Sequence, residues 1–184
     1  MRVTAQRLRA TSGPRDTATT PTSFSAADAG ILLLRLAVGL LLAGHGAQKL
    51  FGIFGGPGLS ATGKGFADMG YRPGDFFAGL AGASEFLGGL GLAVGLLTPL
   101  AAAAVVGVMI NAMATTAPKG LWAEKGGLEY PLCLAVAAIA IAAVGPGLLS
   151  LDRPFRWRHG GWGPAAVALF LGGIGAAIVL ALKA

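Results

Sequence analysis

Charged residues are scarce in this sequence. Only 12% of its 184 residues are Asp, Glu, Lys or Arg, which is about half the share found in a soluble domain. Together with 54% hydrophobic residues and 31 glycines, this scarcity excludes an ordinary soluble domain and indicates a protein of the lipid bilayer. The basic residues behind the net charge of +6 are scattered between apolar blocks. We therefore expect no nucleic-acid partner.

Cysteine and histidine are nearly absent. The single cysteine, Cys133, lies in an apolar run, so one chain can form neither a disulfide framework nor a C-x-x-C redox pair. The two histidines, His45 and His159, fall on opposite sides of the membrane in the topology derived below. A two-histidine haem site within one chain is thereby excluded, and we expect no metal site.

Long apolar runs are abundant. A bilayer core of ~30 Å is crossed by about 20 helical residues, so the 42-residue run 76–117, with Glu85 as its only charge, must contain two spans. We place the break at Thr98-Pro99, because proline opens a helix and disfavours helical geometry in the residue before it. The sequence predicts an all-α membrane protein with spans at 29–51, 76–97, 99–117, 128–149 and 164–182.

The remaining segments are polar or rich in glycine. Residues 1–28, rich in Ser, Thr and Arg, are predicted to form a disordered tail. Residues 52–75 are predicted to form a loop. Its Gly58-x4-Gly63-Lys64 pattern is like that of a phosphate-binding loop, but Gly65 replaces the hydroxyl residue and no strand pattern precedes it. We divide the chain into the tail 1–28, a core 29–153, and a basic loop with a fifth span at 154–184.

The arginines orient the chain in the membrane. If the five spans alternate in direction, seven arginines of the N-terminal tail and the last loop lie on one side, against five basic residues on the other. An excess of Lys and Arg marks the cytoplasmic face. We therefore expect a multi-pass protein of the plasma membrane with its N-terminus in the cytoplasm.

Polar side chains interrupt the spans at matching depths. In the first span, Arg35, His45 and Lys49 fall within roughly 80° of one another on a helix, with Gln48 at the edge of that arc. Ionised groups in hydrocarbon are costly and need partners from other helices. Depths counted from the ends of the spans place the polar residues of four spans in the outer half of one bundle. The expected intramembrane polar cluster consists of Arg35, His45, Gln48, Lys49, Glu85, Asn111, Glu129 and Tyr130.

Several of these residues also have a purely structural interpretation. Arg35 could extend to the cytoplasmic interface and Lys49 to the outer one. Asn111 could join two helices, and His45 could be a hydrogen-bonded packing residue. Glu85 is the hardest to explain structurally, because a carboxylate at mid-depth must be neutral or paired. We expect it to pair with Arg35, or else with His45 and Lys49. No residue is assigned a catalytic role, but His45 and Glu85 are candidates for proton handling.

Four blocks of this sequence resemble the DoxX family. They are RLAVGLLLAGHGAQKLFG with FGGPG, then ASEFLGGLGLAVGLLTPLAA, GLEYPLCLA and SLDR, in the family's order over residues 29–153. The resemblance implies a membrane core of four helices, to which the last span adds a fifth. Some relatives carry a histidine before the loop after the third span, but residues 115–119 contain none. The matching positions are Arg35, His45, Gly46, Lys49, Glu85, Gly89, Glu129 and Tyr130.

The resemblance also carries expectations about function. The related DoxD proteins are linked to thiosulfate oxidation with quinone reduction, and some actinobacterial members are described as anchors of a complex with superoxide dismutase and a sulfurtransferase. It implies an accessory subunit of a redox complex, linked to quinone or sulfur chemistry or to oxidative stress. We expect it to have a polar pocket for a quinone, to hold no cofactor of its own and not to catalyse alone. The alternatives are a non-catalytic anchor for soluble redox enzymes and, less favoured, a conduit for small solutes or protons.

Overall fold

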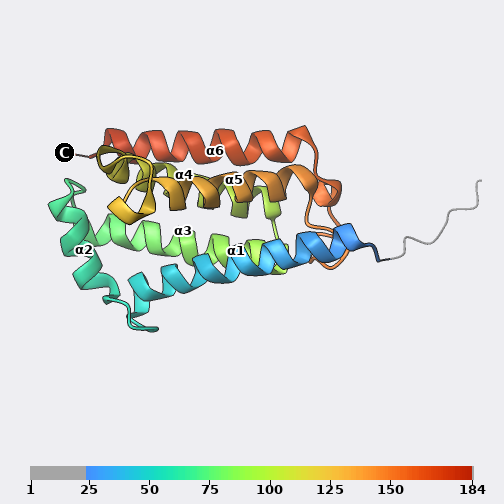
Figure 1. The fold of residues 1–184 in the computed structure, drawn as a ribbon, viewed down its shortest axis with the longest axis horizontal. Helices are drawn as coiled ribbons and strands as arrows, with labels where there is room; N and C mark the ends of the chain where they lie inside the picture. Colours follow the sequence, from blue (N-terminus) through green and yellow to red (C-terminus); the bar gives the residue numbers. More distant parts are fainter. Residues whose placement is uncertain (1–23, 184) are drawn as a thin grey trace, which may run out of the picture.

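The fold is a bundle of long helices. The computed structural model describes residues 24–183, and no strand occurs among them. The long helices alternate in direction, so the two ends of the described chain lie at opposite ends of the bundle (Figure 1). These helices are α1 (Ala26–Phe51), α3 (Gly74–Val94), α4 (Thr98–Thr116), α5 (Glu129–Val144) and α6 (Trp162–Ala181). The predicted all-α membrane bundle is confirmed.

The short helices lie at the two ends of the bundle. Helix α2 (Gly58–Asp68) and the 3-10 helices η1 (Ala117–Lys119) and η2 (Ala123–Lys125) occur at the end that also bears residue 183, and we name it the α2 end. The 3-10 helix η3 (Arg156–His159) lies at the opposite end, where α1 begins, and we name that the η3 end.

Four helices are long and apolar enough to cross a membrane: α1, α3, α4 extended by η1, and α6. Helix α5 is also apolar but has 16 residues, and at ~1.5 Å per residue it covers about 24 Å. It ends at Val144, earlier than the predicted span, because Gly145 adopts φ 92° and Pro146 follows. The residues after Val144 instead form an irregular segment at the η3 end.

Helix α1 begins inside the predicted tail. The Ser25 hydroxyl accepts a hydrogen bond from the Asp28 backbone N–H at 3.2 Å, and the Asp28 carboxylate accepts one from the Ser25 N–H at 3.0 Å. This reciprocal cap starts the helix at Ala26. The prediction of a disordered tail is therefore wrong for residues 25–28, and residues 1–23 lie outside the described part of the chain.

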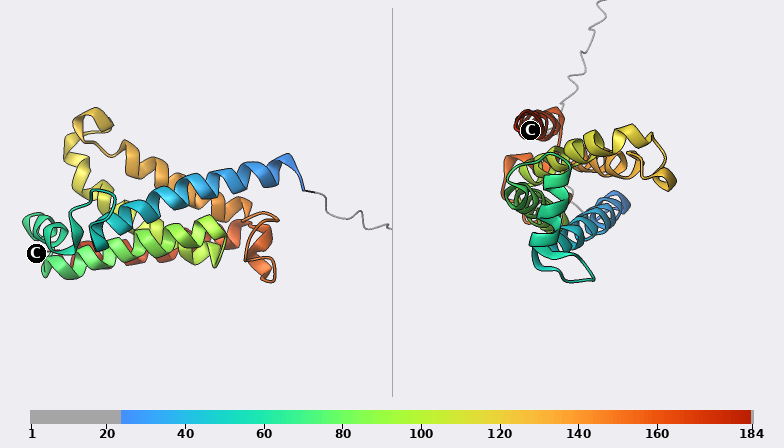
Figure 2. Two further views of the ribbon diagram at one scale, coloured as in Figure 1. Left: turned by 90° about the horizontal axis from the view of Figure 1, so that it is seen from below. Right: turned by 90° about the vertical axis from the view of Figure 1, so that its left-hand side faces the viewer.

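The predicted loop 52–75 contains a helix. Helix α2 lies across one end of the bundle (Figure 2) and packs against α3. Its three glycines are poor helix formers and conceal the helix in the sequence. Gly63 is needed for packing, since a Cβ there would collide with the Asp75 side chain. The phosphate-loop pattern thus belongs to a helix that packs closely against its neighbour.

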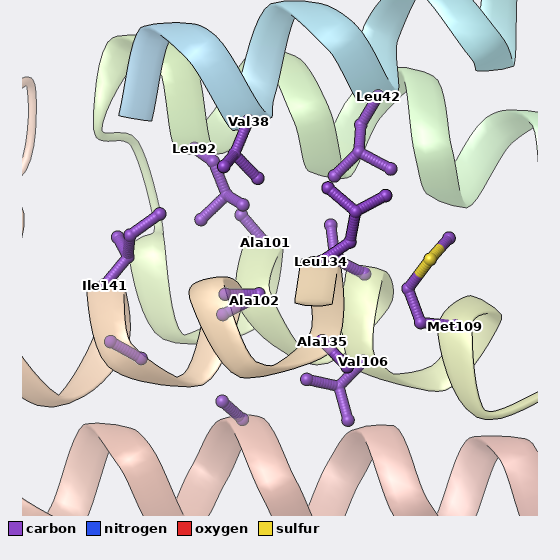
Figure 3. Packing of buried hydrophobic residues seen from close by; sticks show 14 of the residues in the cluster. Val38, Leu42, Leu92, Ala101, Ala102, Val106, Met109, Leu134, Ala135 and Ile141 are labelled. Atoms are coloured by element: carbon purple, nitrogen blue, oxygen red, sulfur yellow. The ribbon is translucent and has the colours of Figure 1, made fainter. Parts of the chain in front are cut away.

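Close packing of α1 against α3 sets the geometry of the site. A Cβ on Gly39 would collide with the backbone of Gly89, and a Cβ on Gly46 with the backbone of Gly82 and Phe86. Small residues at these positions let the two backbones approach. Beside this pair, apolar side chains of α1, α3, α4 and α5 fill the centre of the bundle (Figure 3). Helix α4 packs against α3, α5 and α6, whereas α3 and α6 have almost no contact with each other.

Candidate functional site

The site is built around an ion pair between α1 and α3. The Lys49 ammonium lies 2.5 Å from a Glu85 carboxylate oxygen, and the two side chains are 25% and 7% exposed. It is the only ion pair within residues 24–183. Gly82 allows Lys49 to come this close, because any side chain at Gly82 would meet Leu50 and the Lys49 Cβ. The favoured pairing of Glu85 with Arg35 is therefore wrong, and the alternative partner, Lys49, is confirmed.

A cavity of about 450 Å³ adjoins the ion pair. Helices α3, α4 and α6 form its walls, and residues of α2 and of the turn after it close the cavity at the α2 end. Most of the lining is apolar, from Ala, Gly, Leu, Val, Phe and Met. The polar lining residues are Lys49, Tyr71, Ser84, Glu85, Asn111 and Thr115.

Tyr71 and Asn111 form a second polar pair on the cavity wall. The Tyr71 hydroxyl donates to the Asn111 side-chain oxygen at 3.5 Å, and the Asn111 amide donates to the Gly107 carbonyl at 3.1 Å. Tyr71 is 2% exposed, and burial raises the pKa of its hydroxyl, which therefore stays protonated as a donor. Sequence reasoning missed Tyr71, because the glycine-rich segment around it has no helical or strand periodicity.

His45 and Tyr130 join α1 to α5 beside the ion pair. The His45 Nε2 and the Tyr130 hydroxyl are 2.9 Å apart, and the two rings meet edge to face at 5.9 Å. Neither side chain lines the cavity. Tyr130 is 43% exposed. Polar groups thus extend from the cavity through Lys49 and Glu85 to the contact between α1 and α5.

Two other predicted site residues form hydrogen bonds that stabilise loops. The Gln48 amide donates to the Phe54 carbonyl at 3.1 Å, and the Glu129 carboxylate accepts from the Ala123 N–H at 2.8 Å. Each bond closes the segment next to its own helix. Gln48 and Glu129 lie at the α2 end, as their depth predicts, but neither lines the cavity.

The structure does not bring Arg35 into this group. Its guanidinium is fully buried and donates to the carbonyls of Leu92 at 3.0 Å, Ala93 at 2.9 Å and Leu149 at 3.1 Å, and also to that of Pro146. These carbonyls lie towards the η3 end, as expected for the structural interpretation of Arg35, but the guanidinium is buried in the protein and not exposed to water. Within residues 24–183, no group of three or more His, Cys, Asp or Glu side chains is placed to hold a metal ion.

Comparison with known proteins assigns the family. The model of the DoxX family matches residues 30–118. A membrane protein of Mycobacterium tuberculosis named Rv3486, described as uncharacterized, is 30% identical over 139 residues, which cover 70% of this chain and 82% of the relative. The chain belongs to the DoxX family. No solved structure matches it.

The DoxX match and the site overlap only in part. Lys49, Tyr71, Glu85 and Asn111 all lie within residues 30–118. Helix α6, which forms one wall of the cavity, lies beyond the segment that the DoxX model matches. The polar side of this cavity is therefore built on the family's segment, and part of its apolar side on the helix added after it.

Proposed function

We propose that this DoxX protein is an accessory subunit of a membrane redox complex and that its cavity binds the headgroup of a quinone. The observation that carries the proposal is the cavity beside the buried pair of Lys49 and Glu85. Small-molecule sites are concave and mostly apolar, with a few convergent polar groups, and most have volumes of ~300–1,000 Å³. This cavity meets each of these criteria inside a bundle of membrane helices.

The polar residues of the cavity suit a quinone. A quinone presents carbonyl oxygens that need donors. The Lys49 ammonium and the Asn111 amide are donors on the lining, and each has an N–H beyond its described hydrogen bond. When bound, a quinone supplies two-electron redox chemistry. Glu85 takes up or releases a proton at its carboxylate. His45, one turn of α1 before Lys49, passes that proton on together with Tyr130.

The electrons come from a partner protein in this proposal. The polar lining residues of the cavity transfer protons but carry no electrons. Because this chain resembles DoxX proteins described as anchors of such enzymes, the proposed partners are soluble redox enzymes, such as a sulfurtransferase or a superoxide dismutase. The chain holds the quinone in the membrane and gives these enzymes a docking place.

Native quinone retained on the purified protein tests the proposal. We would purify the wild type and Glu85→Gln in mild detergent and quantify bound quinone by mass spectrometry. Glu129→Gln is the matched control, because it makes the same change at the same end of the bundle but outside the cavity. We expect Glu85→Gln to lose quinone by on the order of tenfold, and Glu129→Gln to retain it. A wild type without quinone would favour the non-catalytic anchor.

We further propose the plasma membrane as the location and a cytoplasmic N-terminus as the orientation, from the seven arginines of the N-terminal tail and of the loop that contains η3. Cysteines introduced at Ser60 and His159, both exposed and at opposite ends of the bundle, test this orientation after Cys133→Ala removes the native thiol. A membrane-impermeant thiol reagent applied to intact cells should label the cysteine at Ser60 and not that at His159. The reverse pattern would invert the topology.

A further inference from the structure

The cavity has one side that no helix covers. It lies between α3 and α6, which have almost no contact with each other, and α4 forms the wall behind it. Leu80 of α3 and Leu171 of α6 both line the cavity and are 43% and 49% exposed. An exposed lining residue on each helix means that the cavity communicates with the surroundings of the bundle between α3 and α6. Those surroundings are hydrocarbon for helices that cross the membrane.

The α2 end of the cavity is closed by aromatic side chains. The Tyr71 ring lies 5.5 Å from that of Phe66 and 5.6 Å from that of Phe77, and all three residues line the cavity. Lys183, just after α6, lies over the Tyr71 ring at 5.0 Å. These contacts tie α2, α3 and the end of α6 together, so the cavity is closed towards water and open towards lipid.

Glycine keeps the α6 side of the opening free. Gly172 packs against α4, where a Cβ would collide with Ala103 and Val106. Gly175, one turn further along, also lines the cavity, but a Cβ there would meet no atom within 4 Å. The space next to Gly175 therefore exists because this position has no side chain, and the first carbon of a larger residue would enter it without a collision.

We propose that the ligand enters sideways from the lipid between α3 and α6, and that it is a quinone with a long apolar tail. The headgroup lies beside Lys49 and Glu85, and the tail remains at Gly175 between the rims formed by Leu80 and Leu171. This inference rests on the proposed quinone-binding function and adds the class of ligand and its route. It also implies that α6 helps to select the ligand, although α6 lies beyond the segment matched by the DoxX model.

The lining favours a quinone tail over the acyl chain of a phospholipid. An acyl chain that filled the whole cavity would place hydrocarbon against the Lys49 ammonium and the Asn111 amide, and neither could replace the hydrogen bonds of its remaining N–H groups. A polar headgroup at that place with an apolar tail in the opening matches both parts of the cavity. A cavity of about 450 Å³ is also too small for a headgroup and a tail of many isoprene units together, so the tail must extend out into the lipid.

Two glycines of α6 provide a matched test. Gly173 and Gly175 both have open space at the Cβ position, but only Gly175 lines the cavity. Wild type, Gly175→Leu and Gly173→Leu would be placed in lipid nanodiscs free of quinone and titrated with two naphthoquinones that share a headgroup. One of them carries a long isoprenoid tail and the other, menadione, has none. Replacing glycine by leucine favours the helix, so both variants are expected to fold.

The expected pattern separates the route from the site. Gly175→Leu should weaken binding of the long-tailed quinone by on the order of tenfold, because leucine occupies the place of the tail. Binding of menadione should change by less than about twofold, because the groups that hold the headgroup are intact. Gly173→Leu should bind both probes as the wild type does.

Other outcomes overturn specific parts of the inference. If Gly173→Leu and Gly175→Leu weaken binding of the long-tailed quinone equally, the ligand does not enter between α3 and α6, and the proposed function stands. If Gly175→Leu weakens binding of both quinones equally, the tail does not lie at Gly175. If the wild type binds neither probe and mass spectrometry finds only phospholipid with the protein, the quinone function itself is wrong.

Discussion

The two ends of the bundle both bury charge, but they satisfy it in different ways. At the η3 end, Arg35 is fully buried and its guanidinium donates to four backbone carbonyls. At the α2 end, Lys49 and Glu85 pair with each other beside a cavity, and Lys49 remains 25% exposed. A charge whose hydrogen bonds all go to backbone is structural. A charge with bonding capacity left over at a cavity is available for a ligand.

At the η3 end, buried charged side chains bind backbone groups of the neighbouring turns. The last carbonyls of a helix lack partners within it, and Arg35 donates to two near the end of α3, those of Leu92 and Ala93. The Asp152 carboxylate, also fully buried, accepts from the N–H groups of Leu97 and Thr98 at 2.8 Å each. Arg35 and Asp152 therefore hold the turn between α3 and α4 against the segment that follows α5.

The α2 end leaves bonding capacity unused. Within residues 24–183, Lys49 is the donor found for the Glu85 carboxylate, and a carboxylate can accept several hydrogen bonds. Lys49 likewise has three N–H donors and one described acceptor. These free positions lie where the two side chains line the cavity. The comparison thus predicts that changes at the η3 end reduce stability, and that changes at the α2 end mainly reduce binding.

The largest effect is expected from Arg35→Leu. The change leaves the four buried carbonyls that Arg35 binds without their donor, which should cost on the order of 3–5 kcal/mol of unfolding free energy. Little folded protein should be recovered, as measured by size-exclusion chromatography and thermal melting in detergent. Arg153→Leu, at an exposed position of the same end, is the control and should melt like the wild type. A wild-type melting curve for Arg35→Leu would contradict its structural role.

An intermediate effect is expected from Glu85→Gln. Lys49 loses its charged partner but is partly exposed, so the loss of stability should be only about 1–2 kcal/mol. Adding Lys49→Met should restore most of that stability, because the two positions are coupled. Bound quinone should stay low in the double variant, since both polar contacts are gone. Melting temperature and bound quinone, measured on the same samples, separate the two effects, and recovery of binding together with stability would contradict the proposed site.

The smallest effect on stability is expected from Tyr130→Phe. It removes one neutral hydrogen bond at a partly exposed position, worth less than about 1 kcal/mol. Bound quinone should also stay at the wild-type level, because Tyr130 does not line the cavity. Quinone reduction by the reconstituted complex should slow if His45 and Tyr130 pass the proton of Glu85. An unchanged rate would remove this pair from the proton path.

The sequence alone determined the existence of the five long helices and the family. Hydrocarbon thickness sets the length of a span, so long apolar runs reveal the helices whatever their neighbours. The predicted break in the run 76–117 is confirmed, since α3 ends at Val94 and α4 begins at Thr98 with Pro99 in its first turn. The blocks that resemble the DoxX family are likewise local patterns. Each of these features depends on residues that are close together in the chain.

Only the tertiary structure decided which polar groups meet. Counting depth along each span assumes that every helix is straight and begins at the membrane surface. It does not say which helices are neighbours. The glycines between α1 and α3 bring Lys49 to Glu85, while Arg35 meets the carbonyls at the far end of the bundle. Helix α2 and Tyr71 gain their positions through contacts with α3, which the glycine-rich sequence does not reveal. The cavity exists because α4 separates α3 from α6, and such spacing depends on side chains far apart in the sequence.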